Sequence, residues 1–419
     1  MASLKKTIDT IARKARSSSR LLGDTQQDKV DNCLRALALL LDERKDAVVK
    51  ANRKDIALAR KKNLSGPMID RLTLTDKAFD AMKKGLNVVA GLSTPVGSVF
   101  DERVRPNGLA IGKMRVPIGV IAIIYESRPN VTVDAASLCL KSRNSVILRG
   151  GSEAFFSNTA LASLIANACE SAGLPGDAVQ LVPTTDRKAI DFLLKKENDI
   201  DLVIPRGGEG LIRAVVEKSR IPVIKHYKGV CHVYVSRFAD MAKAIPIVVN
   251  AKVQRPGVCN AMETLLLDTL LPDVDKVKIL AALVDKGVIL YGDPAVRKLV
   301  KGARRATRED WFAEYLDLRL AVRVVNGAGE AISHINTYGS RHTDSIVTEA
   351  NEEADQFVRL VDSSSVMVNA STRFSDGAEY GLGAEIGIST DKLHARGPMG
   401  VADLTTYKWV VRGNGQIRG

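Results

Sequence analysis

One cysteine stands in a setting that suits covalent chemistry. Cys259 follows Pro256 and Gly257, and it precedes an apolar run that begins near residue 262. Pro and Gly at these positions predict a loop, and loops on a rigid scaffold commonly carry catalytic side chains. The neighbouring Arg255 would favour the thiolate, which is the nucleophilic form of cysteine. On these local features alone, a nucleophile and an inert loop cysteine are equally good interpretations.

The other four cysteines have settings typical of core residues. Cys33, Cys139 and Cys169 lie in helical stretches among Leu and Ala, and Cys231 opens a predicted strand. An odd number of cysteines and an N-terminal segment that reads as an amphipathic helix, rather than as a targeting peptide, indicate reduced thiols and a cytoplasmic protein.

The composition narrows the class of partner. The 419 residues carry a formal net charge of +13, which favours anionic partners such as phosphates and carboxylates. The basic residues are dispersed and aromatic residues make up only 5%, so a nucleic-acid binder is disfavoured. No apolar run approaches the roughly 20 residues that span a bilayer, and no membrane segment is expected.

Short apolar strands alternate with helices after a helical region at residues 3–92. This pattern predicts a parallel, doubly wound α/β sheet. The predicted helices lie near residues 132–142, 157–172, 187–196 and 209–219, and the predicted strands are Val120–Tyr125, Val146–Arg149, Val179–Val182, Leu202–Pro205 and Val223–Lys225.

A second alternation from about residue 233 to 368 predicts a second doubly wound domain. Its strands are Glu263–Leu267, Val288–Tyr291, Ala321–Val325, Ser345–Val347 and Ser365–Asn369. Two such domains in series predict a cleft between them. Residues 99–105 and 109–116 predict a polar hairpin around Pro106-Asn107-Gly108, and residues 404–411 predict a final strand.

Four segments of the chain form distinctive motifs. They are Val116-Pro-Ile-Gly-Val-Ile-Ala-Ile-Ile-Tyr-Glu-Ser-Arg-Pro-Asn-Val-Thr132, Ile204-Pro-Arg-Gly-Gly208, residues 254–263 and His394-Ala-Arg-Gly-Pro-Met-Gly400. These segments resemble the gamma-glutamyl phosphate reductases, the proline-biosynthesis branch of the aldehyde dehydrogenase superfamily, also called glutamate-5-semialdehyde dehydrogenases. The similarity runs from near residue 5 to the C-terminus, with the motifs in the expected order.

The resemblance implies a reaction that passes through a thioester. Cys259 would attack the γ-carbonyl of L-glutamyl 5-phosphate, phosphate would leave, and hydride from NADPH would give L-glutamate 5-semialdehyde. The backbone N–H of Cys259 and the amide of Asn130 are the candidate oxyanion donors, and Arg128 competes with Asn130 for that role.

The resemblance also predicts where this chain departs from hydrolytic aldehyde dehydrogenases. Those enzymes carry a glutamate base before a Gly-Gly pair, whereas this sequence has His226 in Lys225-His-Tyr-Lys-Gly229. A reductase should lack that base, because hydrolysis would waste the thioester. His226 is therefore interpreted as structural. A metal site from His226, Cys231 and His232 is disfavoured, because Cys231 and His232 point to opposite faces of a strand.

Two glycine pairs are the candidate sites for NADP(H). Arg149-Gly150-Gly151 follows a predicted strand, and the guanidinium of Arg149 suits a 2′-phosphate. Arg206-Gly207-Gly208 opens a predicted helix whose free N–H groups suit a pyrophosphate. The resemblance adds Glu314 as a contact to the nicotinamide ribose. Without the family context, each glycine pair is equally well read as a plain strand-to-helix turn.

Several charged residues are candidate partners for the substrate. Arg128, Arg255, Arg373 and Arg396 would meet its anionic groups, and Glu126 would meet its α-ammonium. Each is equally compatible with an ordinary ion pair.

The expected architecture is aldehyde-dehydrogenase-like, with two doubly wound α/β domains and a β-arm for oligomerisation. The cofactor domain is expected at residues 1–102 and 117–230, the catalytic domain at 231–395, and the arm at 103–116 and 396–419. The resemblance implies a homodimer or homotetramer and leaves open a contact with the glutamate kinase that makes the acyl phosphate. The rivals are a CoA-dependent or hydrolysing aldehyde dehydrogenase and a basic scaffolding protein without catalysis.

Overall fold

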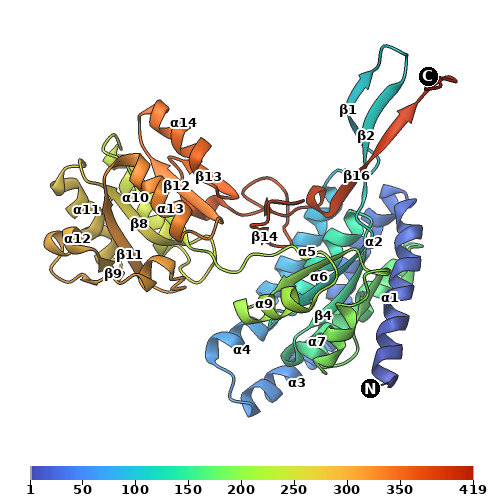
Figure 1. Ribbon diagram of the computed structural model, residues 1–419. Helices are drawn as coiled ribbons and strands as arrows, with labels where there is room; N and C mark the ends of the chain where they lie inside the picture. Colours follow the sequence, from blue (N-terminus) through green and yellow to red (C-terminus); the bar gives the residue numbers. More distant parts are fainter. Residues whose placement is uncertain (1, 419) are drawn as a thin grey trace. The chain divides into compact units, whose positions relative to one another are not determined.

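The computed structural model describes residues 2–418, and these form two compact units. The first unit comprises residues 2–225, Gly381–Gly387 and residues 399–418, and the second comprises His226–Tyr380 and Ile388–Pro398. Each unit contains its own parallel sheet covered by helices (Figure 1). The chain is therefore an α/β protein, as the alternation of strands and helices predicts.

The first unit begins with five helices. In the first of them, Ile8, Ile11, Ala12 and Ala15 are buried at helical spacing, so one face packs on the core. The helices are α1 (Ala2–Gly23), α2 (Gln27–Glu43), α3 (Lys45–Lys61), α4 (Gly66–Leu72) and α5 (Asp76–Gly91).

A four-stranded parallel sheet forms the centre of the first unit, with strand order β5-β4-β3-β6. Every residue of the central strand β3 is buried, which explains its uninterrupted apolar sequence. The strands are β3 (Val120–Tyr125), β4 (Ser145–Gly150), β5 (Val179–Leu181) and β6 (Leu202–Arg206), and the helices between and after them are α6 (Asn130–Lys141), α7 (Phe155–Ser171), α8 (Lys188–Leu193) and α9 (Glu209–Lys218).

The predicted strand Val223–Lys225 is wrong. Only one isolated bridge forms there, between Val203 and Val223. Val203 donates to the carbonyl of Pro222, and Ile224 donates back to Val203. The next bond of this ladder would need an N–H at residue 205, which is a proline, so the pairing stops.

A three-stranded antiparallel sheet completes the first unit. It contains β1 (Val99–Val104), β2 (Ala110–Pro117) and β16 (Thr405–Arg412), which lie side by side in the order β1-β2-β16 (Figure 1). Gly108 adopts a φ of 82° in the connecting turn, a conformation that glycine tolerates best. The predicted hairpin and the predicted final strand are thus confirmed, and they belong to one sheet.

The second unit is built on a seven-stranded parallel sheet, with strand order β10-β9-β11-β8-β7-β12-β13. The chain starts in the middle of the sheet and moves outward in both directions, which is doubly wound topology. The strands are β7 (Cys231–Val235), β8 (Met262–Asp268), β9 (Ile289–Gly292), β10 (Arg304–Arg305), β11 (Arg319–Val325), β12 (Thr343–Val347) and β13 (Ser365–Val368).

The helices of the second unit cover this sheet and bury its apolar side chains. They are α10 (Met241–Val253), α11 (Asp273–Val284), α12 (Pro294–Leu299), α13 (Gly327–Tyr338) and α14 (Asn351–Leu360). A two-stranded ribbon of β14 (Ile388–Ser389) and β15 (Gly397–Pro398) accompanies them. Within residues 2–418, no helix combines the length and the apolar character needed to cross a membrane.

Candidate active site

Cys259 lies on the loop that connects α10 to β8, as its Pro and Gly neighbours predict. Its side chain is half-buried, whereas the other four cysteines are buried. The next residue anchors the loop, because the amide of Asn260 donates to the carbonyl of Ser375 at 2.8 Å. Cys259 is therefore the one cysteine among the described residues that a small molecule reaches from solvent.

Gly229 packs directly against the backbone of Cys259. A Cβ atom at residue 229 would lie 1.9 Å from the carbonyl oxygen of Cys259 and 2.6 Å from its Cα. The N–H of Gly229 donates to Oε1 of Glu314 at 2.7 Å, and the thiol of Cys231 donates to the carbonyl of Cys259 at 3.2 Å. These contacts hold the backbone of Cys259 in one place.

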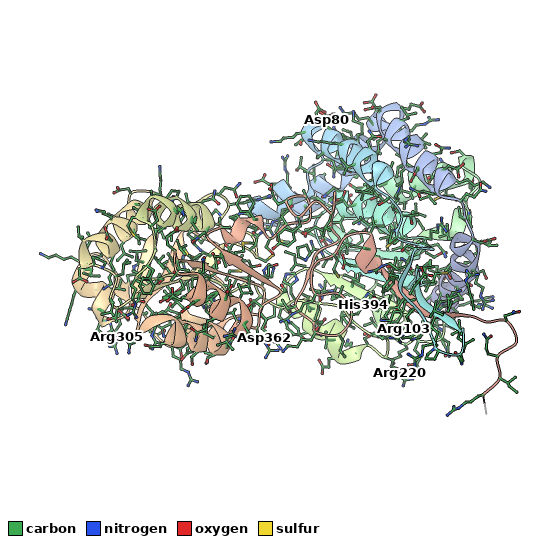
Figure 2. The ribbon with its side chains drawn as sticks, turned by 90° about the horizontal axis from the view of Figure 1, so that it is seen from above. Asp80, Arg103, Arg220, Arg305, Asp362 and His394 are labelled. Carbon is green, nitrogen blue, oxygen red and sulfur yellow. The ribbon has the colours of Figure 1, made fainter. Side chains whose placement is uncertain are left out.

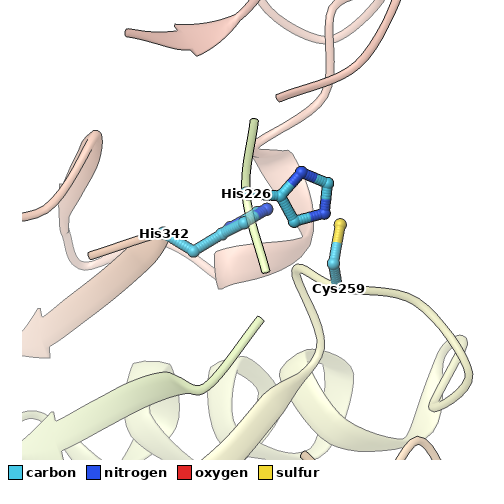
Figure 3. Close-up of side chains that lie close together, drawn as sticks. All are labelled: His226, Cys259 and His342. Carbon is cyan, nitrogen blue, oxygen red and sulfur yellow. The ribbon is translucent and has the colours of Figure 1, made fainter. Parts of the chain in front are cut away.

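Two histidines share the neighbourhood of the Cys259 sulfur. One ring nitrogen each of His226 and His342 and the sulfur of Cys259 all lie within 4.8 Å of one another. Figure 3 shows the sulfur and the tip of the His342 ring both directed toward the ring of His226. An imidazole at this range can accept the thiol proton after a small rotation.

From the sequence, His226 is interpreted as structural, and no sequence feature points to His342. The usable signal for His226 is its position, because the resemblance places the glutamate base of hydrolytic aldehyde dehydrogenases near it. No comparable signal exists for His342, which directly precedes β12 and reaches Cys259 only through the order of strands in the sheet.

A fully buried ion pair supports the strand that follows Cys259. Nζ of Lys252 lies 2.6 Å from Oε2 of Glu263, and neither side chain is exposed. The other oxygen of Glu263 accepts from the N–H of Leu316 at 3.1 Å. Burial raises the pKa of Glu263 to about 7 although Lys252 opposes the rise, and burial lowers the pKa of Lys252.

Lys252→Met is expected to destabilise the protein by about 3–5 kcal/mol, because it leaves a buried carboxylate without its cation. Burial of Glu263 raises its pKa from about 4.5 in the unfolded chain to about 7 in the folded protein. The folded protein therefore loses stability as the pH rises between these two pKa values. Removal of Lys252 raises the folded value further, so the variant should lose stability more steeply than the wild type above pH 5. Urea unfolding at pH 5 and pH 8 measures both slopes.

The double variant Lys252→Met with Glu263→Gln is the control for this prediction. It carries no buried charge at either position, and it should recover part of the lost stability at pH 8. A single variant as stable as the wild type at pH 8 would contradict the assigned cost.

The predicted pyrophosphate site lies in the first unit, at the start of α9. Gly208 directly precedes this ten-residue helix, and a Cβ atom at Gly208 would meet nothing within 4 Å. The N–H of Gly208 donates to Oε2 of Glu126 at 3.0 Å, and a Cβ at Gly207 would meet the same carboxylate. Glu126 therefore shapes the turn that carries Arg206, Gly207 and Gly208.

Arg149 is buried at the end of β4, before Gly150 and Gly151. Its guanidinium donates to the carbonyls of Gly150 at 2.7 Å and Thr185 at 3.2 Å, whereas its buried Nε has no hydrogen-bond partner. Burial lowers its pKa. The glycines are tightly packed, because a Cβ at Gly150 would lie 2.0 Å from the amide of Asn158.

Asn130 is the first residue of α6 in the first unit. Its amide donates to Asp134 at 2.9 Å, a bond within the helix. Burial raises the pKa of Asp134 to about 6, against the effects of this bond and of Arg206. Arg128, the alternative to Asn130 as oxyanion donor, lies two residues before Asn130. The carbonyl of Arg128 accepts a hydrogen bond from the N–H of Val131.

Comparison with known proteins places these observations in a family. The model of the aldehyde dehydrogenase family matches residues 1–286. The gamma-glutamyl phosphate reductase of Geobacter metallireducens is 54% identical over 411 residues, covering 98% of each chain, and that of Desulfatibacillum aliphaticivorans is 54% identical over 416 residues, covering 99% of this chain and 100% of the relative.

The chain belongs to the gamma-glutamyl phosphate reductases of the aldehyde dehydrogenase family. The crystal structure of the Thermotoga maritima gamma-glutamyl phosphate reductase matches with a TM-score of 0.96 at 43% identity, covering 98% of this chain and 100% of that one. An acetylating aldehyde dehydrogenase from Geobacillus thermoglucosidasius, at 17% identity and a TM-score of 0.71, shares the fold. As a member of this family the chain is an oxidoreductase, and the family indicates a nicotinamide cofactor.

Two further candidate residues of the second unit, Glu314 and Arg373, form hydrogen bonds within the protein. Glu314, expected at a nicotinamide ribose, accepts from Gly229 as described above. Nε of Arg373 donates to Gln254 at 2.7 Å, and its pKa is lowered by burial and then by the charge of Arg255. Arg255 itself is exposed.

Arg396 forms an ion pair at the surface. Its guanidinium lies 2.7 Å from Asp362, which is labelled in Figure 2 and also contacts Lys392. The bonds from Lys392 and Arg396 lower the pKa of Asp362 to about 2. Arg396 thus forms an ordinary ion pair in this structure, one of its two expected roles, with an anion already beside it.

Proposed function

We propose that this chain reduces L-glutamyl 5-phosphate to L-glutamate 5-semialdehyde and phosphate with NADPH, in the cytoplasmic synthesis of L-proline. The observation that carries the proposal is the setting of Cys259, which is half-buried, packs against Gly229 and lies near His226. The chain around it is 54% identical to relatives named gamma-glutamyl phosphate reductase. A thiol so placed is accessible, oriented and close to a base.

The chemistry assigned to the chain's own residues starts with a proton transfer from Cys259 to His226. The thiolate then attacks the γ-carbonyl, and the tetrahedral intermediate expels phosphate to leave a thioester on Cys259. Hydride, which NADPH supplies when bound, converts the thioester to a thiohemiacetal. Collapse of this intermediate releases the aldehyde and a thiolate, which takes back the proton held by His226, and the departing phosphate takes a proton from solvent.

Oxyanion stabilisation is assigned to the backbone N–H of Cys259 and the amide of Asn130, with Arg128 as the alternative to Asn130. Arg255 and Arg373 are proposed to receive the anionic groups of the substrate, and the ion-paired Arg396 is the weakest of these candidates. We assign Glu126 to shaping the Gly207–Gly208 turn as well as to the substrate's ammonium.

The cofactor assignment rests on two features of the first unit. The N–H groups at the start of α9 are proposed to receive the pyrophosphate, which would displace the carboxylate of Glu126 from the N–H of Gly208. Arg149 ends β4 beside Gly150 and Gly151, and its guanidinium is proposed to leave the carbonyls of Gly150 and Thr185 and to pair with the 2′-phosphate that distinguishes NADPH from NADH. Gly150, Gly151, Arg206 and Glu314 complete the proposed set.

A CoA-dependent or hydrolysing aldehyde dehydrogenase is the alternative. Hydrolysis needs a base that activates water, and the stretch of residues 225–229 contains no glutamate. His226 stands there instead, close enough to Cys259 to serve the thiol.

NADP⁺ reduction by L-glutamate 5-semialdehyde is expected to require inorganic phosphate as acyl acceptor. Initial rates would be measured with phosphate, with CoA and with neither, using the same enzyme. Rates that do not change on adding phosphate, or that rise only with CoA, would refute the proposed reaction and leave the thioester chemistry standing.

We also propose that the sheet of β1, β2 and β16 joins copies of this chain into a homodimer or homotetramer. Tyr407, Trp409 and Val411 on β16 are about half exposed, at 49%, 52% and 56%, which is unusual for large side chains on a strand. Deletion of residues 409–419 is expected to lower the molecular mass in light scattering to that of a monomer. An unchanged mass would refute this role.

A further inference from the structure

Cys259, His226 and His342 bring together the side-chain types that bind transition metals, one thiol and two imidazoles. We propose that they form a site for Zn²⁺, and that Zn²⁺ bound there reversibly blocks the nucleophile. The proposal concerns metal binding, so it stands or falls independently of which acyl group the enzyme reduces.

The chemistry of the three ligands selects zinc. Thiolate sulfur and imidazole nitrogen are its usual ligands, at about 2.3 Å and 2.0–2.1 Å, and a tetrahedral site then separates ligand atoms by about 3.4–3.6 Å. The three atoms already lie within 4.8 Å of one another. His226 lies in the loop before β7, and Cys259 is half-buried. Side-chain rotations that move the ring nitrogens and the sulfur by about an ångström would bring the three atoms to the spacing that zinc needs.

His342 is prepared for this role by its surroundings. It is buried, and its Nδ1 lies 2.9 Å from the hydroxyl of Thr343, which orients the ring. Metal-bound histidines are typically held in this way through the second nitrogen. The His226 and His342 rings meet edge to face, with centroids 5.5 Å apart and planes at 71° (Figure 3).

The backbone behind the ligands is rigid. Gly229 and Glu314 fix the chain between His226 and β7, and the same glycine packs on Cys259. The backbone of Cys259 and the end of the segment that carries His226 are therefore anchored at Gly229, which reduces the entropy lost when an ion binds. Three protein ligands also leave a fourth position for water, as in accessible zinc sites.

Positive charges near the site limit its affinity. Arg255 and Arg373 interact electrostatically with each other, and Arg373 also interacts with Cys259. They favour anions over cations, so zinc should bind less tightly than at a structural site and leave when a chelator is added. The thiol proton goes to solvent when Zn²⁺ binds, and no electron is transferred.

Co²⁺ and Zn²⁺ titrations of the full-length enzyme test the site directly. Co²⁺ is expected to produce a sulfur-to-cobalt charge-transfer band and the intense visible bands of tetrahedral cobalt, and Zn²⁺ should abolish both. Zn²⁺ should also slow the alkylation of Cys259 by iodoacetamide at least about tenfold, and EDTA should restore the rate.

Three variants and one control separate this site from adventitious binding. Cys259→Ser should lose the charge-transfer band, and His226→Gln and His342→Gln should each weaken Co²⁺ binding by about 100-fold or more. His394→Gln removes an exposed histidine outside the cluster and should bind as the wild type does. If His342→Gln does not fold, His226→Gln decides alone. A cobalt spectrum that survives in Cys259→Ser or His226→Gln overturns the proposal, as does the absence of a spectrum in the wild type.

Discussion

Replacing Cys259 by serine is expected to lower kcat/KM for L-glutamate 5-semialdehyde by about 10⁴-fold or more, without loss of stability. The hydroxyl is a much weaker nucleophile than a thiolate, and no thioester can form. The side chain is half-buried and its loop is held by backbone contacts and by Asn260, so the change removes little packing. Initial rates and thermal unfolding of the purified variant check both parts.

A buried cysteine supplies the control for this experiment. Cys139 lies in α6 of the first unit and is fully buried, and burial raises its pKa far above that of a free thiol. Cys139→Ala should therefore leave the rate close to that of the wild type while lowering the melting temperature. Activity that persists in Cys259→Ser would remove the thioester from the mechanism, whatever the reaction is.

Most of the fold follows from the sequence because its strands are buried on both faces. An uninterrupted apolar run such as Val120–Tyr125 has one stable placement, in the middle of a parallel sheet covered by helices. The same argument fails for Val223, because a proline on the neighbouring strand removes the donor that would extend the ladder. It also misses β10, whose two arginines carry no apolar signal.

The sequence predicts the candidate site only where the residues that decide it are neighbours in the chain. Pro256 and Gly257 place Cys259 on a loop, and this can be read directly from the sequence. The approach of His342 depends on β12 pairing with β7, and the approach of Gly229 depends on β7 pairing with β8. Such contacts come from strand order, which one sequence without relatives does not specify.

Gly229→Ala is expected to reduce kcat/KM by about 100-fold or more, because the added methyl group cannot fit beside Cys259. It would lie 1.9 Å from the carbonyl oxygen and 2.5 Å from the carbonyl carbon of the nucleophile, both of them backbone atoms. The loop must move by an ångström or more, and misplacement on that scale costs about 10²-fold in well-oriented reactions. The same shift would strain the bond from Gly229 to Glu314.

Gly329→Ala is the matched control, because it makes the same substitution in α13 of the same unit, where a Cβ would meet nothing within 4 Å. Alanine is the better helix former, so this variant should be as stable as the wild type or slightly more stable, with full activity. If Gly229→Ala loses activity while its iodoacetamide alkylation rate stays normal, the thiol is still exposed and the defect lies in its orientation. Full activity in Gly229→Ala would mean that the backbone of Cys259 is free to move, and the rigid support assigned to the nucleophile would then be wrong.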